Sequence, residues 1–86
     1  MFVILAYDIH QKRVGKALKV CRKYLTHVQR SVFEGVITEA GLKRLKNELV
    51  QIVVPEEDSV CIYRMETVKY MVKEQLGTVQ EKSHII

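Results

Sequence analysis

The chain has 86 residues, with 14 Lys and Arg against 10 Asp and Glu and a formal net charge of +4. This length predicts one domain with a single small core, near the size at which a chain uses a second copy for further burial. Cys21 and Cys61 lie far apart with no CxxC spacing, which argues against a zinc site or a disulfide framework. We therefore expect reduced thiols and a cytoplasmic protein, and the first apolar run is too short for a membrane span.

Positive charge is concentrated early in the chain. No acid occurs from Ile9 to Phe33. That window holds half of all the cations: Lys12, Arg13, Lys16, Lys19, Arg22, Lys23 and Arg30. A polyanion is one partner for such a surface, and a solvated helix face is the alternative.

The first ten residues read as a buried strand that ends in an acid. Six apolar side chains, Phe2 to Tyr7, are followed at once by Asp8. Successive strand residues point to opposite faces, so both faces of this strand need cover. One face would carry Phe2, Ile4 and Ala6, and the other Val3, Leu5 and Tyr7. Asp8 falls where apolar cover ends, either as a rigidly held functional carboxylate or as a cap of the next helix.

A helix is predicted from about Gln11 to Leu25. Apolar residues recur at the spacing of one buried face: Val14, Ala17, Leu18, Cys21 and Leu25. A second stripe carries Lys12, Lys16, Lys19 and Lys23. Because the helix starts just after Asp8, we expect the carboxylate and these cations to be neighbours.

The stretch from Thr26 to Thr38 reads as extended but is long for one strand. A hairpin of two short strands would explain it, with the turn either at Arg30-Ser31 or at Gly35.

A second helix should begin after Thr38, a suitable N-cap, and end by Pro55. Its apolar stripe is Leu42, Leu45, Leu49 and Ile52. A clear strand follows from Ser59 to Met65, and a weaker one around Val68 to Leu76. The terminal pair Ile85-Ile86 needs an apolar surface, which pairing with a sheet edge would supply.

This order of elements predicts an α+β fold, a ferredoxin-like βαββαβ sandwich with an extra C-terminal strand. We expect residues 1–78 to form the domain and residues 79–86 to form a tail that pairs with a partner subunit. One sheet face then lacks helices, and its apolar side chains predict a homodimer through that face.

Three stretches resemble the CRISPR-associated Cas2 family in order and spacing. They are Tyr7-Asp8-Ile9, the run from Val28 to Gly35 (VQRSVFEG), and the run from Asp58 to Tyr63 (DSVCIY). The resemblance covers the chain from Met1 to about Met65, and VQRSVFEG is its most specific part.

The resemblance implies a homodimer that binds double-stranded DNA and acquires CRISPR spacers with the Cas1 integrase. It also implies a metal-dependent endonuclease acting on RNA or DNA, with Asp8 as catalytic residue and ligand of Mg²⁺ or Mn²⁺. A lone carboxylate makes a weak magnesium site, whereas two Asp8 side chains across a dimer axis would make a credible one.

The nucleic-acid contacts expected from this resemblance are Tyr7, Lys12, Arg13, Lys16, Lys19, Lys23, Arg30 and Phe33. Tyr7 and Phe33 have a second interpretation as core or interface aromatics, and Arg30 one as a partner of Glu34. His10, His27 and His84 read as surface histidines. A ferredoxin-like toxin ribonuclease or small-ligand regulatory domain is the alternative function with the same fold outline.

Overall fold

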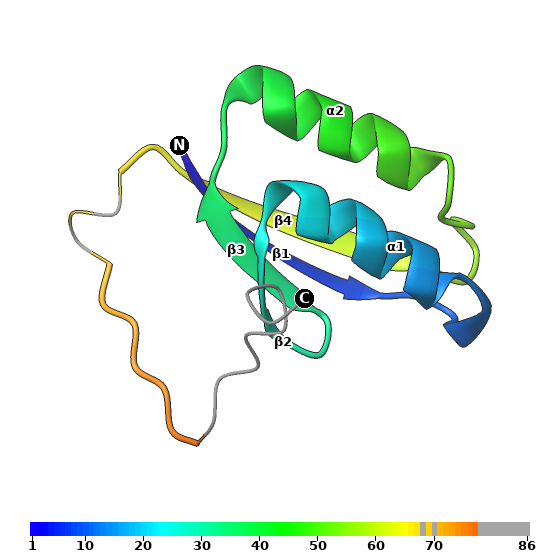
Figure 1. Cartoon of the computed structure of the whole chain (residues 1–86), viewed down its shortest axis with the longest axis horizontal. Helices are drawn as coiled ribbons and strands as arrows, with labels where there is room; N and C mark the ends of the chain where they lie inside the picture. Colours follow the sequence, from blue (N-terminus) through cyan, green and yellow to red (C-terminus); the bar gives the residue numbers. More distant parts are fainter. Residues whose placement is uncertain (68, 70, 78–86) are drawn as a thin grey trace.

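The computed structural model describes residues 1–67, 69 and 71–77 (Figure 1). Its elements, in chain order, are β1 (Phe2–Asp8), α1 (Gln11–Tyr24), β2 (Thr26–Gln29), β3 (Val32–Val36), α2 (Glu39–Val50) and β4 (Ser59–Met65). The predicted order of strands and helices is therefore confirmed through Met65.

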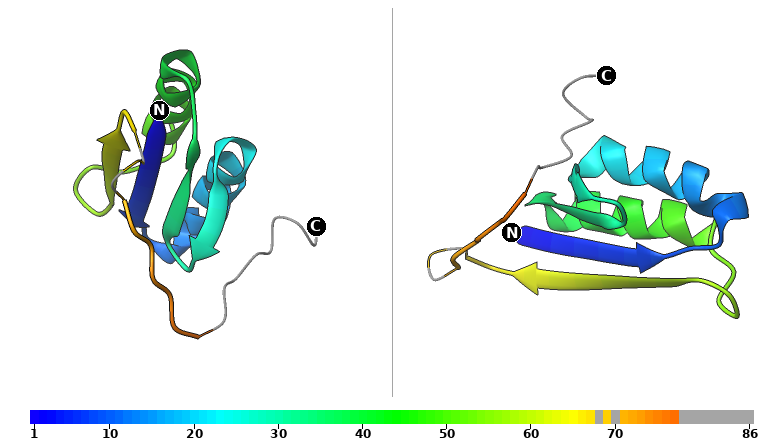
Figure 2. Two further views of the ribbon diagram at one scale, coloured as in Figure 1. Left: turned by 90° about the vertical axis from the view of Figure 1, so that its left-hand side faces the viewer. Right: turned by 90° about the horizontal axis from the view of Figure 1, so that it is seen from below.

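The four strands form one sheet in the order β2-β3-β1-β4, and every neighbouring pair is antiparallel. Both helices cover the same face of this sheet, and the other face carries no helix among the described elements (Figures 1 and 2). We call this second side the open face. The arrangement is the ferredoxin-like fold predicted from the sequence.

The core lies between the sheet and the two helices. In β1, Val3 and Leu5 are fully buried on the helix side, as the alternation predicts. Phe33 of β3 lies opposite Leu5 and is also fully buried, as is Leu45 of α2. Each such apolar side chain contributes about 1.5–3 kcal/mol by leaving water. The sheet that carries Asp8 is therefore firmly held from one side.

The open face is apolar and only partly covered within one chain. Phe2, Ile4 and Ala6 of β1 are half-buried there. Val36 and Tyr63 lie opposite Phe2 and Ile4 in the sheet register and are 78% and 59% exposed.

Local hydrogen bonds explain where the helices begin. His10 is the N-cap of α1, and its Nδ1 accepts the amide of Lys12 at 3.1 Å. The alternative interpretation of Asp8 as this cap is therefore wrong. Thr38 caps α2 as predicted, because its Oγ1 accepts the amide of Gly41 at 3.0 Å. Helix α2 ends at Val50, so Ile52 lies beyond its end.

The hairpin turns at Arg30-Ser31, the first of the two predicted positions. The carbonyl of Ser31 accepts the amide of Tyr7 at 3.0 Å, which ties the turn to the end of β1. Gly35 lies within β3, where an added Cβ would come within 3.4 Å of Leu25. Gly35 is paired with Val3 of β1 and is therefore a strand residue rather than a turn residue.

The weaker strand predicted around Val68 to Leu76 is not formed at residue 69 or at residues 71–76. The segment crosses the open face beside β2 and β3, where Lys73 Nζ donates to Glu34 at 2.7 Å. A chain that crosses a sheet face has no neighbouring strand to pair with, which explains the difference. Val68, Tyr70, the 79–86 tail and its Ile85-Ile86 pair lie outside the described residues.

Candidate functional site

Asp8 is the last residue of β1 and is exposed. It lies directly opposite Ser59, the first residue of β4. Tyr7 before it is buried on the helix side, so alternation places the Asp8 side chain on the open face. A rigid strand thus presents a solvated carboxylate at one end of the apolar open face, as the sequence predicted.

Asp58 holds together the two turns next to Asp8. Its side chain is fully buried and accepts hydrogen bonds on both oxygens. Oδ1 accepts the amide of His10 at 2.8 Å, and Oδ2 accepts the amide of Val54 at 2.8 Å. Arg13 donates to both oxygens, through Nε at 2.7 Å and through a terminal nitrogen at 3.1 Å. These interactions, Arg13 first, hold the pKa of the Asp58 carboxyl well below its usual range.

Arg13 is therefore a structural cation as well as a member of the basic segment. Its guanidinium also donates to Glu57 at 2.9 Å, and its side chain is only 20% exposed. The hydrogen bonds to Asp58 and Glu57 raise its pKa above the ordinary value. The expected phosphate contact is thus not supported for Arg13, since most of its donors are already used.

The lysine stripe of α1 divides into two groups. Lys12, Lys16 and Lys19 are exposed, and no ion pair involves them in the part of the chain that the structure describes. Lys23 is paired with Glu48 of α2. We call Lys12, Lys16 and Lys19 the open lysines.

Glu48 joins the two helices. It accepts the Lys23 ammonium and the Tyr24 hydroxyl, and these interactions lower its pKa. The open lysines belong to the helix layer, on the opposite side of the sheet from the Asp8 side chain. Helix α1 begins at Gln11, just after Asp8 ends β1, so the predicted proximity of carboxylate and cations holds for the first turn of the helix alone.

The two aromatic candidates lie in the core. Phe33 is fully buried and Tyr7 is 7% exposed, with ring centroids 5.6 Å apart. Burial also raises the pKa of the Tyr7 hydroxyl. Neither ring is accessible to a nucleic acid in this fold, so their second interpretation as core aromatics is the correct one.

The histidine and arginine of the hairpin differ in exposure. His27, expected at the surface, is 6% exposed and stacks on Phe33 with centroids 4.6 Å apart, because it alternates onto the helix side of β2. Its Nε2 lies 2.9 Å from the carbonyl of Arg30. The Arg30 side chain is exposed at the turn, and Glu34 pairs with Lys73 instead. Arg30 thus remains available for a phosphate, at the same end of the sheet as Asp8.

Residues 1–72 match the family model described as CRISPR associated protein Cas2. The chain belongs to the Cas2 family. Its relatives include the CRISPR-associated endoribonuclease Cas2 of Dictyoglomus turgidum, 48% identical over 95% of this chain and 94% of that protein. The protein of the same name from Thermotoga maritima is 44% identical over 90% of this chain and 88% of its own length. A crystal structure of a Cas2 protein matches with a TM-score of 0.83 and 38% identity over 93% of this chain and 90% of that one.

Family membership confirms the resemblance drawn from Tyr7-Asp8-Ile9 and VQRSVFEG, and it favours a Cas2 role over a toxin ribonuclease or a small-ligand regulatory domain. No helix in the described part of this Cas2 chain is long and apolar enough to cross a bilayer.

Among the residues that the structure describes, Asp8 is the candidate ligand for the metal that the family implies. In the described residues, no three His, Cys, Asp or Glu side chains come together as a metal site. Magnesium is commonly held by one or two carboxylates together with waters and substrate phosphates. Asp8 fits that donor set as one carboxylate, and a second copy on the open face would add another.

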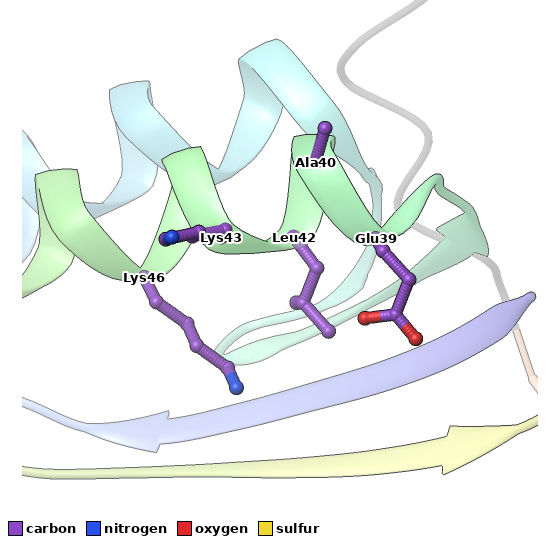
Figure 3. Close-up of a pocket in the computed structure, with 5 residues that line it drawn as sticks. All are labelled: Glu39, Ala40, Leu42, Lys43 and Lys46. Atoms are coloured by element: carbon purple, nitrogen blue, oxygen red, sulfur yellow. The ribbon is translucent and has the colours of Figure 1, made fainter.

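A hollow of about 330 Å³ lies along α2, lined by Glu39, Ala40, Leu42, Lys43 and Lys46 (Figure 3). Glu39, its one acid, is paired with Arg64 of β4. The hollow begins near Ile37, whose amide bonds the carbonyl of Met1 at the start of β1. It therefore begins at the opposite end of the sheet from Asp8 and shares no residue with that site.

From the sequence, Asp58 was identified only as the first residue of the DSVCIY stretch and was assigned no role in the site. Its partners Arg13 and His10 lie 45 and 48 residues away along the chain, so no local spacing reveals them. The one local signal is that an acid, Asp58, directly precedes a predicted strand. The partners of that acid can be identified only from the fold.

Proposed function

We propose that this Cas2 chain acts in the cytoplasm as a homodimeric adaptor of CRISPR adaptation, which binds double-stranded DNA and works with the Cas1 integrase. The observation that carries the proposal is the row of open lysines on the outer side of α1. Ammonium groups at helical spacing bind backbone phosphates without reading sequence. Membership in the Cas2 family supports a role in a CRISPR system.

The homodimer is proposed through the open face. Phe2, Ile4 and Val36 form an apolar surface that one chain leaves partly exposed, and Tyr63 extends it onto β4. Burial of these side chains against a second copy would favour association. The dimer would double the basic surface and present one row of open lysines on each outer side.

Spacer integration by the purified protein with its integrase tests the adaptor directly. The double variant Lys12→Ala, Lys16→Ala should bind duplex DNA more weakly and fail to support integration. Asp8→Asn should support integration, because it removes no phosphate contact. Loss of integration in Asp8→Asn, with the lysine variant active, would contradict the adaptor and favour an enzymatic role.

A metal-dependent endonuclease is the second candidate. It is favoured by the exposed carboxylate at the strand end and by the relatives from Dictyoglomus turgidum and Thermotoga maritima, which are named CRISPR-associated endoribonucleases. Asp8 would hold Mg²⁺ or Mn²⁺, with the second carboxylate supplied by the partner subunit's Asp8. Such an ion supplies charge stabilisation at the phosphoryl oxygens and a water of lowered pKa. In this Cas2 chain, the strand would keep the carboxylate in place, and Arg30 would bind a neighbouring phosphate.

Cleavage of an end-labelled single-stranded RNA in Mg²⁺ tests this candidate. Asp8→Asn keeps the shape of the side chain and loses its charge, so we expect the rate to fall by roughly a thousandfold or more. EDTA should have the same effect on the wild type. Glu56→Gln, a matched change at an exposed acid, should leave the rate unchanged. Cleavage retained in Asp8→Asn would show that the activity comes from elsewhere.

A further inference from the structure

The turns on either side of Asp8 lie together at one end of the molecule. One turn leads from β1 to α1 and contains His10, and the other leads from α2 to β4 and contains Asp58 (Figures 1 and 2). Asp8 is the last paired residue of its strand, so the sheet fixes it from one direction only. The hydrogen bonds that fix the two turns therefore also fix the backbone that continues from Asp8 beyond the last strand pair.

Asp58 contacts both flanks of Asp8 through the backbone. It bonds the amide of His10, two residues after Asp8, and it directly precedes Ser59, the register partner of Asp8. Its bond to the amide of Val54 closes its own turn, in which the carbonyl of Val54 also accepts the amide of Asp58 at 2.8 Å. The two flanks are therefore held in one hydrogen-bonded unit.

Arg13 compensates the charge of this unit. A fully buried carboxylate is costly to leave unpaired, and the Nε and terminal nitrogen of Arg13 satisfy it in a fork. Because Arg13 lies in the first turn of α1, the same fork sets where the helix starts relative to β4. The lowered pKa of Asp58 agrees with a carboxylate that stays ionised in this position.

We propose that Asp58 and Arg13 are positioning residues for Asp8, holding its carboxylate at the orientation needed for metal binding and cleavage. The proposal deepens the endonuclease function and rests on it. Arg13 is then set apart from the open lysines, since it acts through Asp58 rather than on the nucleic acid. Partners that orient a metal ligand typically contribute about 10- to 100-fold in metal affinity or activity.

The first test compares kinetics of the full-length protein. Asp58→Asn keeps the volume of the side chain but cannot accept all four of the hydrogen bonds that Asp58 receives. We expect kcat for RNA cleavage to fall by about 10- to 100-fold and the Mg²⁺ midpoint to rise, with KM for RNA little changed. Glu57→Gln is the matched control, because the Glu57 side chain bonds Arg13 and not the backbone of either turn. The Glu57 amide bonds the carbonyl of Val54 whatever the side chain, so this variant should behave as wild type.

The second test separates the two possible roles of Arg13. Arg13→Lys retains the positive charge but loses the fork, so it should lower kcat as Asp58→Asn does while leaving the salt dependence of DNA binding unchanged. If Asp58→Asn does not fold, Arg13→Lys still tests the proposal. Wild-type kcat and Mg²⁺ midpoint in a folded Arg13→Lys or Asp58→Asn protein would overturn the proposal and leave the role of Asp8 intact.

The third measurement needs no activity. Three-bond NMR couplings across χ1 of Asp8, in metal-free protein, should indicate one rotamer in the wild type and averaging in Asp58→Asn. Should Asp8→Asn still cleave RNA, the endonuclease function fails, and these couplings alone decide whether Asp58 fixes the Asp8 side chain. Identical couplings in both proteins would overturn the positioning role.

Discussion

Lys23 of α1 forms an ion pair with Glu48 of α2, which distinguishes it from Lys16 two turns earlier on the same stripe. The charge of Lys23 is already compensated within the protein. Both residues lie on the same side of the helix, so they form a matched pair for measuring phosphate contacts.

We expect Lys16→Gln to reduce the slope of log affinity against log salt by about 0.9 for duplex DNA, the effect of one lost phosphate contact. Lys23→Gln should change it by much less, because Glu48 already neutralises that ammonium. Fluorescence anisotropy with a labelled duplex at several salt concentrations measures both slopes. Equal slopes for the two variants would mean that Lys23 leaves Glu48 when DNA binds.

The two thiols provide a test of the open-face dimer. Cys61 is exposed and lies opposite Ala6 on the open face, whereas Cys21 is buried and its pKa is raised to about 12 by that burial. A second copy on this face should shield Cys61, so its reaction with a thiol reagent should slow as protein concentration rises. Cys21 should stay slow at every concentration and serves as the internal control.

Mass spectrometry after timed labelling assigns the modified cysteine. Labelling of Cys61 at one rate over the range in which sedimentation shows dimer formation would place the dimer interface away from the centre of the open face.

Acid stability should reveal the buried carboxylate of Asp58. Its folded pKa lies below the unfolded value, so its contribution to the free energy of unfolding is complete above about pH 5 and is lost as pH falls through the folded pKa. Asp58→Asn lacks this titration, so the stability difference between wild type and variant should shrink from about pH 5 to about pH 2.

Urea unfolding at fixed protein concentration measures this difference at each pH. Glu48 also has a lowered pKa, but it is present in both proteins and cancels in the comparison. A difference that stays constant with pH would show that Asp58 is not held ionised by Arg13.

Local patterns were enough to predict most of the fold. Alternation in Phe2 to Tyr7 gave the correct two faces of β1, and Thr38 was correctly identified as a cap, because both signals act within a few residues. The position of the hairpin turn remained open, because Arg30-Ser31 and Gly35 both carry turn signals and only the strand pairing, which places Gly35 within β3, decides between them.

The candidate site was predicted less completely, for a physical reason. Asp8 followed from the end of an apolar strand, which is local. Whether Arg13 serves a phosphate or a carboxylate depends on Asp58, 45 residues away, and whether Lys23 is open depends on Glu48, 25 residues away. Charge runs show where cations are, but only the fold shows which acids reach them.

The last prediction concerns the packing of α2. Leu45 is fully buried against the sheet, whereas Val50 at the end of the same helix is 66% exposed. Leu45→Ala should lower the free energy of unfolding by about 2–5 kcal/mol, because it removes buried methyl groups and leaves a cavity. Val50→Ala should cost less than about 0.5 kcal/mol, as is usual for a surface change.

Urea titrations at one protein concentration compare the two variants. Val50 borders an apolar hollow with Val53 and Ile62. Both a small and a large loss of stability in Val50→Ala are therefore informative. A small loss means that this flank of α2 faces water in solution. A loss comparable to that of Leu45→Ala would contradict the prediction, because it would require that part of the assembled protein covers Val50, and the interface would then extend beyond the open face.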